Sequence, residues 1–221
     1  MDEEQRYLLA LLQTPVESDK TDYKAAVTFR EGEDFSLKLV KHILGFANSG
    51  GGHIIVGYKE EALDGTLKVD PSLTDDVIGS YEVTRLSSYV NSILGSQDRI
   101  DLTISKIDHE HKKFPIIYVS PFKKRPYFCK KDISLSNGTN VLEEGAIYIR
   151  VPGAQTVKVA GAGDWDRLIT QCVESDYETF LKRAREVLKK EPPQKGSAQM
   201  EQEAIKKLED IRRRFRGETK G

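Results

Sequence analysis

The sequence predicts one α/β domain over residues 1–190, in which helices cover a mixed β-sheet. Apolar residues recur at helical spacing between Phe35 and Phe46, whereas residues 102–107 alternate strictly between apolar and polar. Between these segments, a short apolar run, Ile54–Val56, follows three glycines, which is typical of a buried strand. The chain of 221 residues is 38% apolar and 31% charged, which is enough for a core and a charged surface.

Four helices are expected, and flanking residues indicate where the first two end or begin. The helices span residues 4–13, Phe35–Phe46, Thr84–Leu94 and Trp165–Leu188. Pro15 ends the first, because proline cannot continue a helix. Asp34 can cap the second through its side-chain oxygens. The apolar stripe of the last helix consists of Leu168, Ile169, Cys172 and Val173.

Strands are expected between these helices. They span Ile54–Tyr58, Leu102–Ile107, Pro115–Ser120 and Gly145–Val151. A polar turn over residues 108–113 separates the second strand from the third, so the two are predicted to form a hairpin. Residues 17–24 are predicted to be extended, but they carry too many charges for a core strand.

The glycine-rich block, residues 46–57, lies after a helix and before a strand. A nucleotide-binding P-loop has the opposite order, strand then helix, and contains a Gly-Lys-Ser/Thr sequence. This block has neither feature. The order observed here favours a helix that ends at a glycine in the left-handed conformation and leads into a buried strand.

Composition excludes several classes of protein. No segment approaches the roughly 20 apolar residues of a transmembrane helix, so no membrane partner is expected. The acidic N-terminus lacks a signal-peptide core. Cys129 and Cys172 lie far apart, which favours a reducing, cytoplasmic location over a disulfide framework. Together with His109 and His111, these cysteines match no zinc-site spacing.

A Pro/Gly-containing linker, residues 191–197, separates the body from a basic tail, residues 198–221. Residues 182–221 carry 13 Lys and Arg against 7 Asp and Glu, whereas the rest carries 21 against 28. The tail has apolar residues at coiled-coil spacing: Met200, Ala204, Leu208, Ile211 and Phe215. This pattern is consistent with a helix docked on the body, a partner-binding helix or a homodimer, and two heptads alone give only a weak dimer.

Acidic residues gather in two segments. Glu17, Asp22 and Lys24 belong to the extended segment, and Glu60 follows the strand that begins at Ile54. If the two segments pair, the carboxylates converge and repel one another unless a cation or shared proton offsets their charge. A divalent ion, Mg²⁺ or Mn²⁺, is the usual solution and can activate water for phosphodiester cleavage. The three carboxylates are therefore candidate metal ligands, Lys24 is a candidate phosphate contact, and the alternative is a solvated acidic surface.

Basic and aromatic residues share a proline-bounded loop. They are Phe122, Lys123, Lys124, Arg125, Tyr127 and Phe128. The cations are candidate phosphate contacts and the aromatic rings, Tyr127 among them, can stack on exposed bases. The alternative is a solvated turn whose rings anchor the core. Arg150, which alternates outward from its apolar neighbours, is a further candidate nucleic-acid contact, whereas His53 is predicted to be structural.

The chain resembles the Schlafen AlbA-like domain family from about Leu8 to Val173. The matching motifs are Glu17-x-x-x-x-Asp22-Tyr23-Lys24, Phe46-Ala-Asn-Ser-Gly-Gly-Gly-His-Ile-Ile-Val-Gly57, Pro115-Ile-Ile-Tyr-Val-Ser-Pro-Phe-Lys-Lys-Arg-Pro-Tyr127 and Gly145-Ala-Ile-Tyr-Ile-Arg-Val-Pro-Gly153. The resemblance implies an α/β domain and a metal-dependent endoribonuclease acting on tRNA-like RNA. It places the three carboxylates of that site at Glu17, Asp22 and, nearest the third, Glu60. It also implies that a single copy would have to dimerise to build a comparable groove.

The sequence is thus compatible with three functions. The first is a metal-dependent endoribonuclease acting on structured RNA such as tRNA. The second is a non-catalytic DNA- or RNA-binding or regulatory module, whose acidic residues are incidental. The third is an interaction protein that works through its tail. RNA is a more strongly expected partner than DNA.

Overall fold

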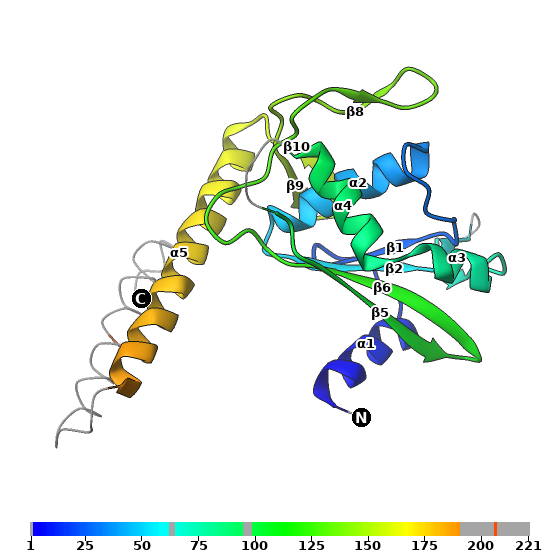
Figure 1. The fold of residues 1–221 in the computed structure, drawn as a ribbon, viewed down its shortest axis with the longest axis horizontal. Coiled ribbons are helices and arrows are strands. Elements are labelled where there is room, and N and C mark those ends of the chain that lie inside the picture. Colours follow the sequence, from blue (N-terminus) through cyan, green and yellow to red (C-terminus); the bar gives the residue numbers. More distant parts are fainter. Residues whose placement is uncertain (1, 62–64, 95–98, 191–205, 207–221) are drawn as a thin grey trace. The chain divides into compact units, whose positions relative to one another are not determined.

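The computed structural model describes residues 2–61, 65–94, 99–190 and 206 (Figure 1). The chain forms two compact units, Met1–Asp176 and Tyr177–Gly221. All the strands that the structure describes lie in the first unit, and the second begins within the last helix. The predicted linker, 191–197, and the tail, 198–221, lie outside the described residues apart from the helical Lys206.

The centre of the first unit is a four-stranded mixed sheet, which confirms the predicted fold class. Its order is β1 (Thr21–Lys24), β2 (Gly52–Val56), β6 (Lys112–Val119) and β5 (Leu102–His109). β1 runs parallel to β2, and the other neighbours are antiparallel. β5 and β6 form the predicted hairpin, and Glu110 and His111 in its turn both have positive φ, as a two-residue hairpin turn requires.

Helices cover both faces of this sheet (Figure 1). The helix α1 (Glu3–Gln13) covers the face of Tyr23, whose hydroxyl donates to the Leu11 carbonyl at 2.7 Å. On the other face lie α2 (Asp34–Ala47) and α4 (Val83–Ile93). A side chain at Gly52 would meet the Phe46 ring at 2.3 Å, so this glycine allows α2 to approach the sheet.

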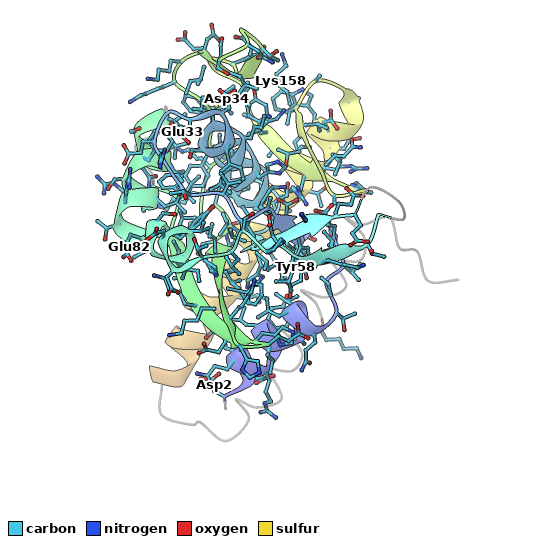
Figure 2. All side chains as sticks on the ribbon, turned by 90° about the vertical axis from the view of Figure 1, so that its right-hand side faces the viewer. Asp2, Glu33, Asp34, Tyr58, Glu82 and Lys158 are labelled. Carbon is cyan, nitrogen blue, oxygen red and sulfur yellow. The ribbon has the colours of Figure 1, made fainter. Side chains whose placement is uncertain are left out.

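The start of α2 differs from the sequence prediction. Asp34 does not cap the helix; Glu33 occupies the cap position and makes no side-chain capping bond. The Asp34 carboxylate instead accepts hydrogen bonds from the backbone amide and hydroxyl of Ser136, at 2.8 and 2.6 Å. Figure 2 labels Asp34 and Glu33 at this end of the helix. These bonds lower the pKa of Asp34. The helix start is therefore tied to a distant loop.

Smaller elements surround the central sheet. They are the hairpins β3 (Tyr58–Glu60) with β4 (Leu67–Val69), β7 (Ile133–Ser134) with β8 (Asn140–Leu142), and β9 (Tyr148–Val151) with β10 (Gln155–Lys158), and the short helix α3 (Asp75–Ser80). Only β9 among these strands was predicted as a complete element. The β9–β10 hairpin contacts α2, so this helix packs between two sheets.

The last helix, α5 (Ala162–Lys190), contains the predicted helix, but its apolar stripe is divided. Leu168 is buried and Cys172 packs against the core, whereas Ile169 and Val173 are 56% and 52% exposed. Only part of the predicted apolar stripe therefore packs against the core. Among the described residues, no helix has the length and apolar character needed to cross a membrane.

Candidate functional site

The predicted acidic segment that begins at Glu17 includes β1, and Asp22 on this strand lies in the protein interior. In the parallel register of β1 and β2, Asp22 lies opposite Ile54. Asp22 is only 1% exposed to solvent. Thr21 and Tyr23 are also buried. The prediction that this segment is too charged for a core strand is therefore wrong for Thr21–Lys24. A buried carboxylate needs partners, because its desolvation is otherwise costly.

Two cationic side chains provide those partners, and a histidine lies beside them. The Lys24 Nζ lies 2.5 Å from Oδ2 of Asp22, and Nη1 of Arg150 lies 3.5 Å from Oδ1. Nδ1 of His42, on α2, lies 3.7 Å from Oδ2. The side chains of Asp22 and Arg150 are 2% and 0% exposed, so this is a buried ion pair. The carboxylate charge is offset by the protein's own cations.

Arg150 corrects a second prediction, because its side chain points inward. Nη2 donates to the Ser18 carbonyl at 3.0 Å, Nη1 donates to Thr156 Oγ1 at 3.4 Å, and the guanidinium lies 4.4 Å from the centre of the Phe46 ring. Alternation along β9 was predicted correctly, but α2 covers the face that was taken as exposed. Arg150 therefore has no surface for nucleic acid in this structure.

Burial also changes the proton affinity of this cluster. Desolvation lowers the pKa of His42 to about 4, and the charge of Lys24 lowers it further, whereas that of Asp22 opposes the shift. The imidazole is therefore neutral near pH 7. Nδ1 of His42 lies 3.3 Å from Nη1 of Arg150 and accepts from it, because a guanidinium can only donate. Desolvation lowers the pKa of Arg150, and Asp22, Glu17 and Asp19 oppose that change.

The remaining predicted catalytic residues lie along an adjacent groove, which Lys24 joins to Asp22. Glu17, Lys24 and Glu60 line a cavity of about 780 Å³, which Asp22 does not line. Glu17 and Glu60 are exposed, and Glu17 accepts a hydrogen bond from the Tyr23 amide at 3.4 Å. The structure thus brings two carboxylates and Lys24 to one groove.

This arrangement does not fit the three-carboxylate metal site implied by the resemblance. The third carboxylate, Asp22, is buried and already paired with Lys24 and Arg150. Within residues 2–61, 65–94, 99–190 and 206, no group of three or more His, Cys, Asp or Glu side chains is placed to hold a metal ion. Arg150 and Lys24 supply the positive charge that the sequence analysis assigned to a metal.

The glycine-rich block builds a rigid junction through Asn48, which the sequence analysis did not single out. Asn48 ends α2 and is 1% exposed. Its side-chain amide donates to the Tyr127 and Tyr148 carbonyls at 2.9 and 3.0 Å and accepts from the Tyr127 amide at 2.7 Å. A polar residue at the end of an apolar helix, beside glycines, was the available signal. Asn48 thereby fixes the end of the basic loop.

That loop presents the predicted basic residues around one cavity. The cavity has a volume of about 270 Å³ and is lined by Arg99, Asp101, Lys123, Lys124, Arg125 and Tyr127. Lys123 pairs with Asp101 at 2.7 Å. Arg99 was not predicted, because it lies 24 residues before Lys123 in the sequence and joins the cluster only through folding.

The sequence left open whether the aromatic rings of the loop stack on bases or anchor the core, and the structure shows buried rings and an exposed one. Phe122 and Tyr127 are 2% and 4% exposed, so they are core anchors and offer no ring face for stacking. The Tyr127 hydroxyl donates to the Arg99 carbonyl at 2.9 Å, which ties the two basic segments together. Phe128 is 37% exposed and stays accessible. The predicted stacking role of Tyr127 is not supported by its position.

His53 has the structural surroundings that were predicted. Its ring centre lies 5.3 Å from that of Tyr7 and 5.0 Å from that of Tyr118, and desolvation lowers its pKa. The two tyrosines are 48% and 37% exposed. The histidine therefore sits within an aromatic cluster on the α1 side of the sheet.

Two solved structures show a distant similarity to this chain. The DIP2311 protein from Corynebacterium diphtheriae is 16% identical with a TM-score of 0.44, and the match covers 77% of this chain and 29% of that one. The N-terminal domain of a putative ATP-dependent DNA helicase RecG-related protein from Nitrosomonas europaea is 17% identical with a TM-score of 0.37, covering 73% and 97%. The chain thus corresponds to under a third of the first protein's length. No curated protein matches the sequence.

The family assignment comes from a match over more than half of the chain. The model of the family described as Schlafen, AlbA_2 matches residues 17–159. This range includes β1 with Asp22, the glycine-rich block, the basic loop and β9 with Arg150. The chain belongs to the Schlafen AlbA_2 family.

Proposed function

We propose that this protein binds nucleic acid, RNA in preference to DNA, through the basic surface formed by Arg99, Lys123, Lys124 and Arg125. The observation that carries the proposal is the convergence of four cations from two segments around one cavity, which Asp101 alone lines with a carboxylate among the residues that the structure describes. Cations grouped in this way contact phosphates and position the nucleic acid. Family membership supports the class of partner, and the preference for RNA rests on the Schlafen resemblance.

The charge state of this surface favours phosphate binding. Lys123 is engaged with Asp101. In the part of the chain that the structure describes, Lys124, Arg125 and Arg99 make no ion pair, so their charges are available to a ligand. Phe128 lies three residues beyond Arg125 and is the accessible ring of the loop. It could stack on an unpaired base, which is the usual mode of recognition for single-stranded RNA.

The endoribonuclease activity implied by the resemblance is a second candidate. One observation favours it, because Glu17, Lys24 and Glu60 line the same groove. It would require Asp22 to leave its buried ion pairs with Lys24 and Arg150 and to join that groove. Binding without metal-dependent cleavage requires no such rearrangement, and we therefore favour the non-catalytic function.

The double variant Lys124→Ala/Arg125→Ala tests the proposed surface. Each lost phosphate contact is expected to lower the slope of log K against log salt by about 0.7 for a single strand, so the double variant should lower it by roughly 1.4. The measurement is fluorescence anisotropy of a labelled single-stranded RNA, titrated at several salt concentrations. A single-stranded DNA of the same sequence tests the preference for RNA.

The matched control is Lys112→Ala/Lys113→Ala, two adjacent lysines at the opposite end of β6 from the basic loop. This control removes the same formal charge and should leave the affinity and its salt slope nearly unchanged. If both double variants weaken binding equally, the effect is one of net charge, and the assignment of the surface is wrong.

A further inference from the structure

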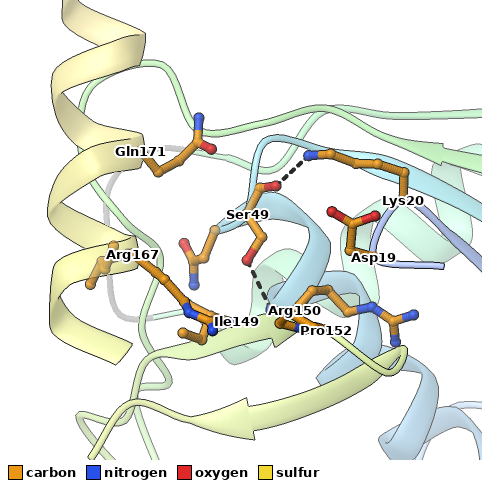
Figure 3. Close-up of a pocket in the computed structure, with 10 residues that line it drawn as sticks. Asp19, Lys20, Ser49, Ile149, Arg150, Pro152, Arg167 and Gln171 are labelled. Atoms are coloured by element: carbon orange, nitrogen blue, oxygen red, sulfur yellow. Dashed lines mark hydrogen bonds between the residues drawn. The ribbon is translucent and has the colours of Figure 1, made fainter. Parts of the chain in front are cut away.

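A further cavity, of about 300 Å³, lies at the glycine turn between α2 and β2 (Figure 3). It is separate from the basic surface of the proposed function. Its polar lining includes Asp19, Lys20, Ser49, Arg167 and Gln171. These residues come from the segment before β1, the turn itself and α5, all within the unit Met1–Asp176. Three distant parts of the sequence thus supply one set of polar groups.

The glycine turn makes room for this convergence. Gly50 and Gly51 have φ values of +82° and +78°, a conformation that favours glycine. A side chain at Gly50 would lie 2.7 Å from Nζ of Lys20 and 2.9 Å from Oε1 of Gln171. Both side chains therefore meet over the turn because residue 50 carries no Cβ.

Lys20 and Ser49 each keep hydrogen-bond donors for a ligand after their bonds within the protein are taken into account. Nζ of Lys20 donates one bond to the Ser49 carbonyl at 2.5 Å, which leaves two of its three protons. Oγ of Ser49 accepts from the Arg150 amide at 2.8 Å, so its hydroxyl proton points elsewhere. Figure 3 shows both bonds, and it shows the Arg150 guanidinium directed away from Ser49. Arg150 thus contributes its backbone to this cavity.

The cavity has an excess of positive charge. Arg167 is exposed on the first turns of α5, and no ion pair involves it within the described ranges. Asp19 is the carboxylate that lines the cavity. Partial burial lowers the pKa of Lys20, and the charges of Asp19 and Glu174 raise it. Asp19 thus helps to keep Lys20 charged, while Arg167 is left to attract an anion.

Apart from Asn48, whose amide already donates to the Tyr127 and Tyr148 carbonyls, the rest of the lining is apolar. Ile149 and Leu168 are 1% and 3% exposed, and Pro152 completes this wall. The volume is at the lower end of the range for small-ligand cavities, roughly 300–1,000 Å³. A polar end with spare donors beside an apolar wall matches a single nucleotide, which has a charged phosphate joined to an apolar ring face.

We propose that this cavity binds one nucleotide through its terminal phosphate, which Lys20, Ser49 and Arg167 hold, while the exposed Pro152 supports the sugar or base. The phosphate monoester has two possible sources, the phosphorylated end of a bound strand and a free mononucleotide. The first source rests on the proposed function, since the strand is held at the basic surface. The second does not.

The test compares three fluorescent RNA oligonucleotides of one sequence: 5′-phosphorylated, 3′-phosphorylated and unphosphorylated. A charge-assisted hydrogen bond contributes enough for about a tenfold change in affinity, so one phosphorylated form should bind about tenfold tighter than the unphosphorylated form. Arg167→Gln should remove most of that preference, and it changes an exposed side chain. Lys20→Met should remove it as well. Lys124→Ala, at the basic surface, should weaken all three RNAs and keep the preference.

Titration with AMP separates this inference from the proposed function. If wild-type protein binds all three RNAs equally and does not bind AMP, the cavity assignment is overturned while the proposed function stands. If no RNA binds but AMP binds and Arg167→Gln weakens it, the proposed function fails and the cavity takes a free nucleotide. If neither RNA nor AMP binds, both proposals are overturned.

Discussion

Asp22→Asn is expected to lower the free energy of unfolding by about 3–5 kcal/mol in metal-free buffer, because it removes one partner of a buried ion pair. The side chains of Asp22 and Arg150 are 2% and 0% exposed, so water cannot replace the lost carboxylate charge. Urea denaturation in the presence of EDTA measures this change. The metal-site interpretation predicts the opposite sign, because removing one of three repelling carboxylates would stabilise the metal-free protein.

Two further variants make this prediction specific. Glu60→Gln alters an exposed carboxylate and should change stability by no more than about 0.5 kcal/mol. Arg150→Met in the Asp22→Asn background should recover part of the loss, because both charges are then gone and the two effects are not additive. Stabilisation by Asp22→Asn, or additive losses in the double variant, would contradict a buried ion pair.

His42 is expected to make stability fall as the pH decreases from about 6.5 toward 4. Its folded pKa is about 4, below the ordinary value of 6.5, because burial and the charge of Lys24 disfavour the protonated ring. The folded state thus binds fewer protons than the unfolded state over this range. The contribution of the neutral His42 to the free energy of unfolding is therefore fully present above pH 6.5 and is lost as the pH falls toward 4. The shift corresponds to about 3 kcal/mol at most.

The check is the difference in unfolding free energy between wild type and His42→Gln across this pH range. The variant should show a flatter curve, because its side chain does not titrate. His53→Gln should flatten the curve as well, because burial also lowers the pKa of His53, which lies in a separate aromatic cluster, and the two effects should add. Identical curves for wild type and His42→Gln would show that His42 is not held neutral.

Local patterns in the sequence were sufficient to predict much of the fold. The alternation of residues 102–107 and the polar turn after them identified the β5–β6 hairpin, because strand periodicity and turn chemistry act over a few residues. The helix–glycine–strand order of residues 46–57 was also recognised correctly. In contrast, β7, β8 and β10 are two to four residues long and carry too little pattern to identify.

The site was predicted less well, because its partners are distant in the sequence. Asp22 was assigned to a metal because its neighbours in the chain are acidic, but its partner Arg150 lies 128 residues away. The alternation that placed Arg150 on one face of β9 was correct, and only the packing of α2 shows that this face is buried. Charge compensation of this kind cannot be inferred from spacing.

The residues that match the family motifs are joined in one series of contacts. Arg150 pairs with Asp22 through its guanidinium and donates to Ser49 through its amide. The residue before Ser49, Asn48, holds the Tyr127 backbone, which follows the basic cluster. The acidic segment, the glycine-rich block and the basic loop therefore support one another structurally. In this account the motif residues build the frame that presents Lys124 and Arg125.

The most direct test of the central claim, nucleic-acid binding without metal-dependent cleavage, uses wild-type protein and total tRNA. The mixture is incubated with excess EDTA and, in parallel, with Mn²⁺ or Mg²⁺ at matched ionic strength, and both complex formation and RNA length are followed. The account predicts that tRNA is bound in all conditions and stays intact. Cleavage that appears with the metal, is abolished by EDTA and is lost in Asp22→Asn would contradict it.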